Sequence, residues 1–99
     1  MEKLTTTIKR QWLREIVARR KTVEFRDIKP YWTDRLEHRQ CPFLLRLVNG
    51  MTVTPPEVTV RIDRVHKNTG SGKYELHIGS IVEVRHWDQR RECPTKAIG

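Results

Sequence analysis

Three charged residues, Lys21, Glu24 and Arg26, stand close together in the stretch ARRKTVEFRD, residues 18–27. Alternate side chains of a strand share a face, so Glu24 and Arg26 can form an ion pair. A lysine at the mouth of that strand can donate to a phosphate or to negative charge developing on an oxygen. A glutamate with a raised pKa can serve as general base on water or a ribose hydroxyl. Lys21 and Glu24 are therefore the candidate catalytic residues, unless the three charges only join two structural elements.

The segments around these residues have the periodicities of a helix and a strand. A short β-prone segment at 4–8 comes first. An apolar stripe then predicts a helix from Lys9 to about Arg20, with the members Ile8, Trp12, Leu13, Ile16 and Val17. Residues 21–27 alternate as a strand does, with Val23 and Phe25 on the face opposite Glu24, and Pro30 ends the strand. The junction thus brings the three charges to one place.

Downstream, the chain predicts one short helix and several strands. Residues 31–39 favour a short helix in which Tyr31 or Trp32 packs with Leu36. Apolar runs separated by turn residues predict strands at 43–48, 57–65, 73–78 and 81–87.

The order of elements indicates the fold class. Val65 falls out of phase with the strand before it, which predicts a β-bulge near Asp63. An early helix followed by antiparallel strands predicts an α+β fold. We expect five or six mostly antiparallel strands to curl into a small barrel, with one main N-terminal helix.

Length and composition limit the organisation. The 99 residues suit a single domain, expected over 1–88, with 89–99 as a flexible polar tail. No apolar run is long enough to cross a bilayer, and no signal-peptide region is found, so no membrane partner is expected. Two cysteines, Cys41 and Cys93, are too few for a disulfide framework, which favours the cytoplasm.

Charge indicates the class of partner. The chain holds 20 Lys and Arg against 12 Asp and Glu, a formal net charge of +8. Residues 1–50 hold twelve basic and six acidic residues, a balance of +6, whereas 51–99 hold eight and six, a balance of +2. The planar guanidinium of arginine suits phosphates and base faces, and nucleic acid is the polyanion such a protein most often meets.

The expected nucleic-acid contacts are basic or aromatic residues of the first half: Arg10, Arg14, Arg20, Lys21, Arg26, Lys29, Tyr31, Trp32 and Arg46. Tyr31 and Trp32 either stack on bases or cap the core, and the sequence leaves both roles open.

No metal or cofactor is expected. Neither His38 with Cys41 nor His77 with His86 has the spacing of a paired zinc-ligand motif. The sequence also lacks a Walker loop, a dinucleotide fingerprint and a nucleophile elbow.

The stretch before and after Lys21 resembles the signature of the ASCH domain family, within the PUA-like superfamily. That signature reads Gly-x-Lys-x-x-Glu-x-Arg; Lys21, Glu24 and Arg26 match it, and Arg19 stands at the glycine position. A non-glycine residue there is expected to avoid left-handed φ. The later segments PFLLRLVNGM and YELHIGSIVEV resemble barrel strands of short bacterial members, so the resemblance covers 4–87.

The resemblance implies a β-barrel with a cleft beside the first helix and a role in binding RNA or a modified nucleotide. Some relatives are ribonucleases, and others are amidohydrolases that remove the acetyl group of N4-acetylcytidine. In the amidohydrolases a threonine occupies the position of Glu24, so the candidate hydroxyl nucleophile is absent here. RNA binding is the expected function, with metal-independent RNA cleavage in the same cleft as a further activity and amidohydrolysis as the alternative.

Overall fold

The computed structural model describes residues 1–95 of the chain. Within them, two helices and seven strands follow one another in this order: β1 (Lys3–Thr7), α1 (Arg10–Val17), β2 (Val23–Asp27), α2 (Pro30–Leu36), β3 (Phe43–Val48), β4 (Glu57–Asn68), β5 (Lys73–Arg85), β6 (Trp87–Asp88) and β7 (Cys93–Pro94). The predicted α+β class, the main N-terminal helix and the short second helix are confirmed.

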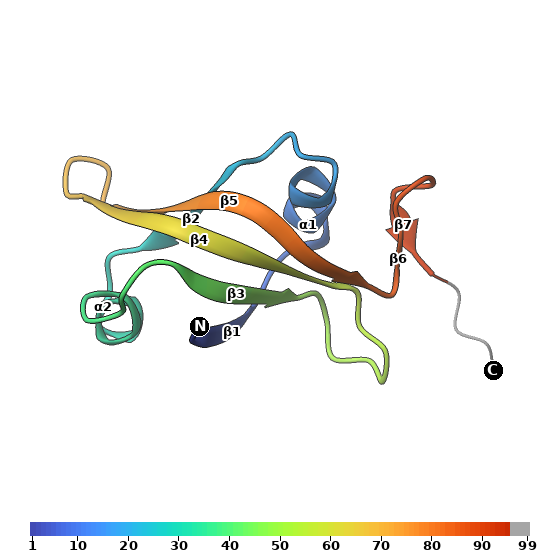
Figure 1. Cartoon of the computed structure of the whole chain (residues 1–99), viewed down its shortest axis with the longest axis horizontal. Helices are drawn as coiled ribbons and strands as arrows, with labels where there is room; N and C mark the ends of the chain where they lie inside the picture. The colour runs from blue at the N-terminus through green and yellow to red at the C-terminus, as the bar shows by residue number, and fades with distance from the viewer. Residues whose placement is uncertain (96–99) are drawn as a thin grey trace.

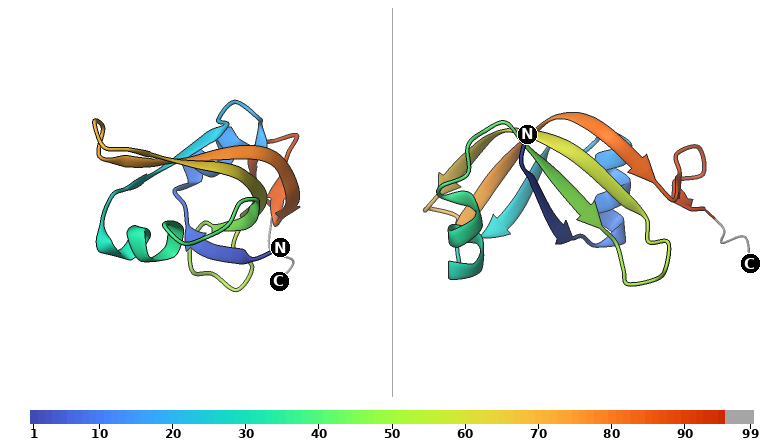
Figure 2. Two further views of the ribbon diagram at one scale, coloured as in Figure 1. Left: turned by 60° about the vertical axis from the view of Figure 1, so that its left-hand side comes forward. Right: turned by 60° about the horizontal axis from the view of Figure 1, so that its bottom comes forward.

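Five of the strands form one mixed sheet in the order β1-β3-β4-β5-β2. β1 runs parallel to β3, and the other neighbours are antiparallel. The sheet curls so that the edge strands β1 and β2 face each other across an open side, with α1 and α2 toward opposite ends (Figures 1 and 2). The predicted curled sheet is therefore a half-barrel, whose two edges have no ladder between them in the described residues.

The core fills the inner face of this half-barrel. Phe43 pairs with Ile62 and Leu45 with Val60, and all four side chains are fully buried. Their strict alternation with partly exposed neighbours in β3 is the period of a strand with one apolar face. Burying a side chain of this size stabilises the fold by roughly 1.5–3 kcal/mol, so the β3–β4 pair anchors the sheet.

The helices add to this core in different ways. The apolar stripe of α1 buries Leu13, Ile16 and Val17 as predicted, but Trp12 is 43% exposed. In α2, Leu36 is buried and Trp32 packs partly against the core, whereas Tyr31 is half exposed. Of the two aromatic residues that the sequence left open, Trp32 is therefore the one that contacts the core.

The long β4–β5 hairpin is irregular at its centre. Its register shifts between Thr59 and Arg64, so the predicted bulge near Asp63 is confirmed. The predicted break at residues 79–80 is wrong, because β5 continues through Gly79. A Cβ at Gly79 would overlap the Asp63 carboxylate, whose Oδ1 accepts a hydrogen bond from Arg61 Nε at 2.6 Å. Glycine is therefore needed at position 79 to make room for the Asp63 side chain at the bulge.

The segment after residue 88, expected to be a polar tail, begins with ordered structure. β7 pairs with β6, the Thr95 N–H donates to the His86 carbonyl at 3.1 Å, and Trp87 is buried. The expected tail therefore starts with a small hairpin, and residues 96–99 of that tail lie outside the described residues.

The end of α1 differs from the sequence-based expectation. Arg19 has a φ of +64°, in the left-handed region that it was expected to avoid. The Arg19 N–H donates to the Ile16 carbonyl at 2.9 Å, and the Arg20 N–H donates to the Glu15 carbonyl at 2.9 Å. This is the hydrogen-bond pattern of a Schellman motif, so the arginine takes the glycine role because the motif satisfies the last carbonyls of the helix.

Replacing Arg19 with glycine tests this conformation. A left-handed φ is unfavourable for a residue with a Cβ, so Arg19→Gly should raise the free energy of unfolding by about 1 kcal/mol. Arg19→Ala removes the same side chain but keeps the Cβ, and it should leave the stability near that of the parent. Urea denaturation of the three proteins checks this; equal stability of the glycine and alanine variants would contradict it.

Candidate functional site

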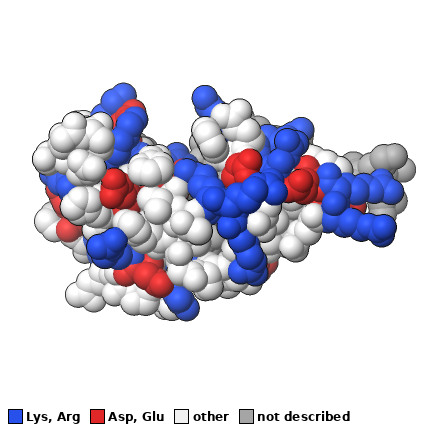
Figure 3. Space-filling model, turned by 90° about the horizontal axis from the view of Figure 1, so that it is seen from above, with Lys and Arg blue, Asp and Glu red and all other residues white. Residues whose placement is uncertain are grey.

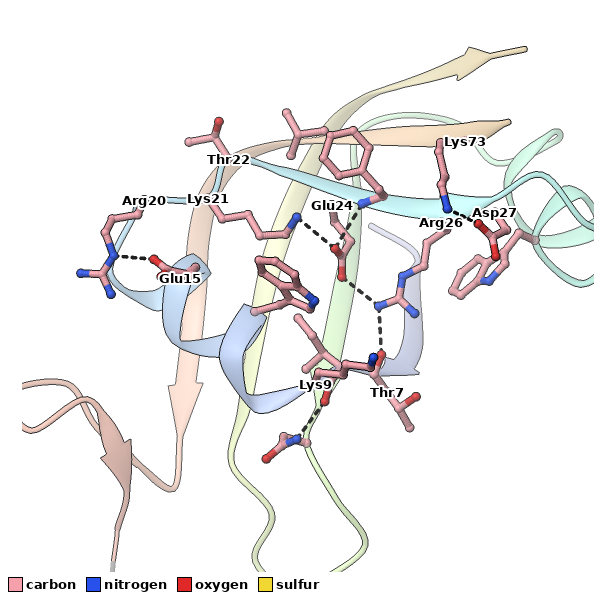
Figure 4. Close-up of a pocket in the computed structure, with 16 residues that line it drawn as sticks. Thr7, Lys9, Glu15, Arg20, Lys21, Thr22, Glu24, Arg26, Asp27 and Lys73 are labelled. Carbon is pink, nitrogen blue, oxygen red and sulfur yellow. Dashed lines mark hydrogen bonds and ion pairs between the residues drawn. The ribbon is translucent and has the colours of Figure 1, made fainter. Parts of the chain in front are cut away.

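A cleft of about 1170 Å³ opens between α1 and the facing ends of β1 and β2. Figure 4 shows that its walls come from segments far apart in the sequence: the end of β1, one side of α1, the whole of β2, and single residues of α2 and β5. The cleft exists where the half-barrel fails to close. Its polar residues thus line a gap between two sheet edges.

Glu24 lies at the base of this cleft with a side chain only 6% exposed. Its Oε1 is 3.4 Å from Lys21 Nζ and accepts the Phe25 N–H at 3.1 Å. Its Oε2 accepts a hydrogen bond from Arg26 Nη2 at 2.9 Å. A buried carboxylate is tolerated only when it is paired in this way. The structure therefore brings the three signature charges together around one buried group.

Arg26 also bridges the open side of the half-barrel. Its Nη2 donates to the Thr7 carbonyl at the end of β1, at 2.9 Å, while the residue itself belongs to β2. Its guanidinium carbon lies 5.0 Å from the centre of the Trp32 ring. One side chain thus links the two edge strands and α2 where no backbone ladder connects them.

Lys21 lies between two aromatic rings. Its Nζ is 4.9 Å from the centre of the Phe25 ring and 5.2 Å from that of Trp12, distances typical of cation–π contacts. Both rings line the cleft, and Trp12 and Phe25 remain 43% and 49% exposed. The lysine side chain is 15% exposed. The cleft therefore presents one ammonium group between two rings that solvent can reach.

Sequence reasoning missed Trp12 and Phe25 as site residues. It assigned Trp12 to the core because Trp12 falls on the apolar stripe of the helix, and it placed Phe25 on an apolar face of the strand. Their contacts with Lys21 arise from the fold, which brings α1 and β2 together at this residue, and no local pattern in the sequence indicated them.

The rim of the cleft is charged but largely paired. Five basic and three acidic residues line the cleft as a whole, a balance of +2. Glu15 pairs with Arg20, and Asp27 pairs with Lys73. The hydrogen bond from Lys73 holds the pKa of Asp27 below its usual value, and the hydrogen bonds to Glu15 and Glu92 raise the pKa of Arg20. The lining of the cleft therefore carries a net positive charge although its acids are paired.

Five of the sequence-predicted site residues line the cleft: Arg20, Lys21, Glu24, Arg26 and Trp32. Arg10 does not line the cleft, but its Nε donates to Oδ1 of the lining residue Asn49 at 3.1 Å. The other predicted contacts lie elsewhere.

The predicted contacts outside the lining have partners of their own. Arg14 donates from Nε to the Glu92 carbonyl at 3.3 Å. Lys29 lies 3.6 Å from Asp27 and is well exposed. Tyr31 is half exposed, and the Arg35 guanidinium carbon lies 3.4 Å from its ring centre.

Arg46 lies on β3, outside the cleft, and forms a fork-like pair with Glu57. Its Nε and Nη2 donate to the two carboxylate oxygens at 2.9 and 2.7 Å. Glu57 is buried, and the hydrogen bonds from Arg46 lower its pKa. Because its guanidinium pairs with a buried carboxylate, we expect Arg46 to stabilise the fold and not to contact a ligand in the cleft.

Arg46→Met should therefore destabilise the fold by about 2 kcal/mol at neutral pH, because it leaves a buried carboxylate without its partner. Arg61→Met is the control, since the Arg61–Asp63 pair is exposed and should contribute little. Urea denaturation measures both.

The pH dependence of this loss has a defined sign. The folded-state pKa of Glu57 is lowered from 4.5, so the pair stabilises the fold above that pH and loses its effect as pH falls through the folded value. The difference between parent and Arg46→Met should shrink in acid. A pH-independent difference would contradict the role of this pair.

Within residues 1–95, no three His, Cys, Asp or Glu side chains lie close enough together to hold a metal ion. In the same residues, neither helix has the length and apolar character needed to cross a bilayer.

Comparison with known proteins adds no further assignment. No protein-family model matches the chain, and no curated protein matches it. The chemistry of the cleft must therefore be inferred from its own side chains.

Proposed function

We propose that the protein binds single-stranded RNA and that one nucleotide of the strand occupies the cleft. The observation that carries this proposal is the placement of the Lys21 ammonium between the exposed rings of Trp12 and Phe25. Cationic groups bind phosphates, and aromatic rings stack on bases in a way that tolerates any sequence. A nucleotide is the ligand that needs both.

The cleft retains donors for an anion. Lys21 has three N–H donors and directs one contact at Glu24, so the others can reach a ligand. Arg26 uses Nη2 for Glu24 and for the Thr7 carbonyl, which leaves its Nη1 and Nε donors without a hydrogen-bond partner among the described residues. Lys21 and Arg26 both line the cleft, and basic residues outnumber acidic residues in its lining.

The shape of the site favours an unpaired strand. A base can reach rings at the wall of a cleft only when it is free of its partner strand, and sequence-independent readers of single strands use such stacking. Thr7, Thr22 and Asn49 also line the cleft and offer polar groups of the kind that a ribose hydroxyl bonds. We therefore propose RNA as the strand, and single-stranded DNA is the comparison ligand.

The position of Glu24 favours binding over cleavage. Both of its oxygens contact protein donors, and its side chain is almost fully buried. A general base needs an oxygen within hydrogen-bond reach of the proton that it removes. We propose that Glu24 instead positions Lys21 and Arg26.

Lys21→Met tests the proposed function, since it removes the charge and keeps most of the side-chain stem between the rings. Affinity for single-stranded RNA should fall by about tenfold or more, because a charge-assisted contact is lost. Lys3→Met removes an equal charge at an exposed position on β1 and should leave affinity near that of the parent. Fluorescence anisotropy with labelled RNA measures both variants, and circular dichroism confirms that they fold.

Two outcomes would count against the proposal. Equal affinity of parent and Lys21→Met would show that the cleft does not hold the RNA. Shortening of RNA by the pure parent protein in EDTA, lost in Glu24→Gln, would show a metal-independent ribonuclease in place of a binding protein.

The aromatic wall gives a second test. Trp12→Leu should weaken RNA binding by about tenfold, within the range for one base–aromatic stack. Tyr31→Leu is the matched control, because Tyr31 is a similarly exposed ring outside the cleft. The same anisotropy titration measures both, and an equal loss in the two variants would contradict stacking in the cleft.

A further inference from the structure

The C-terminal hairpin carries two exposed arginines, Arg90 and Arg91, in the turn between β6 and β7. The main-chain N–H groups of both donate to Asp88 Oδ1 at 3.0 Å, and Arg91 Nε lies 4.0 Å from Asp88 Oδ2 at the exposed surface. Trp87 anchors the hairpin in the core. The two arginines therefore lie on a turn that main-chain hydrogen bonds hold in place, and their side chains are exposed.

This turn lies against the C-terminal end of α1. Glu92, at the end of the turn, joins the two elements: its Oε1 is 2.8 Å from Arg20 Nη2, and its carbonyl accepts Arg14 Nε at 3.3 Å. These contacts place the turn arginines beside the arginines of the helix end. More than half of the chain separates the two groups in the sequence, so the fold alone brings them together.

Together these residues form a continuous basic surface, which we name the arginine ridge: Arg14, Arg19, Arg20, Arg90 and Arg91, all exposed. Three acids lie among them: Glu15 and Glu92 pair with Arg20, and Asp88 Oδ2 lies 4.0 Å from Arg91 Nε, so five basic and three acidic residues leave a balance of +2. Figure 3 shows Lys and Arg side chains gathered over this end of the molecule around a few acidic groups. The ridge meets the cleft at Arg20, which lines both.

We propose that the arginine ridge binds the phosphate backbone of the RNA where the strand leaves the cleft, so that several consecutive nucleotides are held. This inference rests on the proposed function. Its own support is the position of Arg20, which lines the cleft and is joined through Glu92 to the turn that carries Arg90 and Arg91, so the basic residues of the ridge begin where the cleft ends. Exposed guanidinium groups gathered on one surface repel one another and attract a polyanion, and their planar forks match phosphate oxygens.

The test compares the parent with Arg90→Ser/Arg91→Ser, a variant that keeps the backbone hydrogen bonds of the turn. The probes are a labelled dinucleotide, long enough only for the cleft, and an oligouridylate of about 12 nucleotides, a length within the usual range for single-strand sites. Affinities are measured by anisotropy between about 50 and 200 mM salt. Arg61→Ser/Arg64→Ser is the control, because it removes two arginines from β4, away from the ridge.

The parent should bind the oligouridylate more tightly than the dinucleotide. The ridge variant should lose about tenfold in affinity for the oligouridylate at low salt, and the slope of log affinity against log salt should become shallower by about 1.4, since each phosphate contact on a single strand contributes about 0.7. Its affinity for the dinucleotide and the behaviour of the control variant should match the parent.

The outcomes separate the two proposals. An oligouridylate affinity and salt slope equal to those of the parent would overturn the ridge and leave binding in the cleft intact. Failure of the parent to bind either probe would instead overturn the proposed function, and the ridge with it. Ridge-dependent binding to vesicles of anionic lipid, without ridge-dependent binding to the oligouridylate, would overturn the ridge as an RNA surface in favour of a membrane surface.

Discussion

The burial of one carboxylate, that of Glu24, determines the arrangement of the cleft. A charge with so little access to water must be neutralised by nearby groups, and here Lys21 and Arg26 do so from the two sides. Arg26 then reaches across the open side of the half-barrel to the Thr7 carbonyl. The pairing of a single buried group thus fixes two cations and links two sheet edges that no ladder connects. The sheet can remain open at this place because a side chain, rather than a backbone, spans the gap.

This arrangement has a consequence for recognition. Cations that are already held by a buried partner lose little conformational freedom when a ligand arrives, and preorganisation of this kind increases affinity. The same contacts limit how strongly a ligand can compete, because a phosphate that pulled Lys21 and Arg26 away from Glu24 would leave the buried carboxylate uncompensated. A ligand must therefore use the remaining donors of the two cations and the exposed rings of Trp12 and Phe25. This limit on competition is consistent with reversible binding of the nucleotide that we propose.

Local patterns in the sequence predicted what depends on local geometry. The alternation of residues 21–27 was enough to place Glu24 and Arg26 on one face, and the phase slip before Val65 was enough to place the bulge. What the sequence could not provide is the pairing of distant segments. The partner of Arg46 became known only from the β3–β4 register, and the contacts of Glu92 with the helix end only from the fold. Trp12 was misassigned because periodicity reports which face a residue occupies and not where that face meets the edge of the core.

At Arg19 the side chain is unfavourable for the backbone conformation but adds positive charge to the surface. At this site the Schellman motif turns the chain so that the Arg20 and Lys21 N–H groups both donate to the Glu15 carbonyl, at 2.9 and 3.0 Å. That turn delivers Lys21 to the cleft, and glycine would form it with less strain. An arginine there carries a backbone penalty of about 1 kcal/mol but adds a guanidinium at the point where the cleft meets the arginine ridge. Residues held in unfavourable backbone regions tend to gather at functional sites, where the surrounding structure enforces them. The strained residue lies directly before the two cations that line the cleft, so the position of the strain agrees with the position of the proposed RNA path.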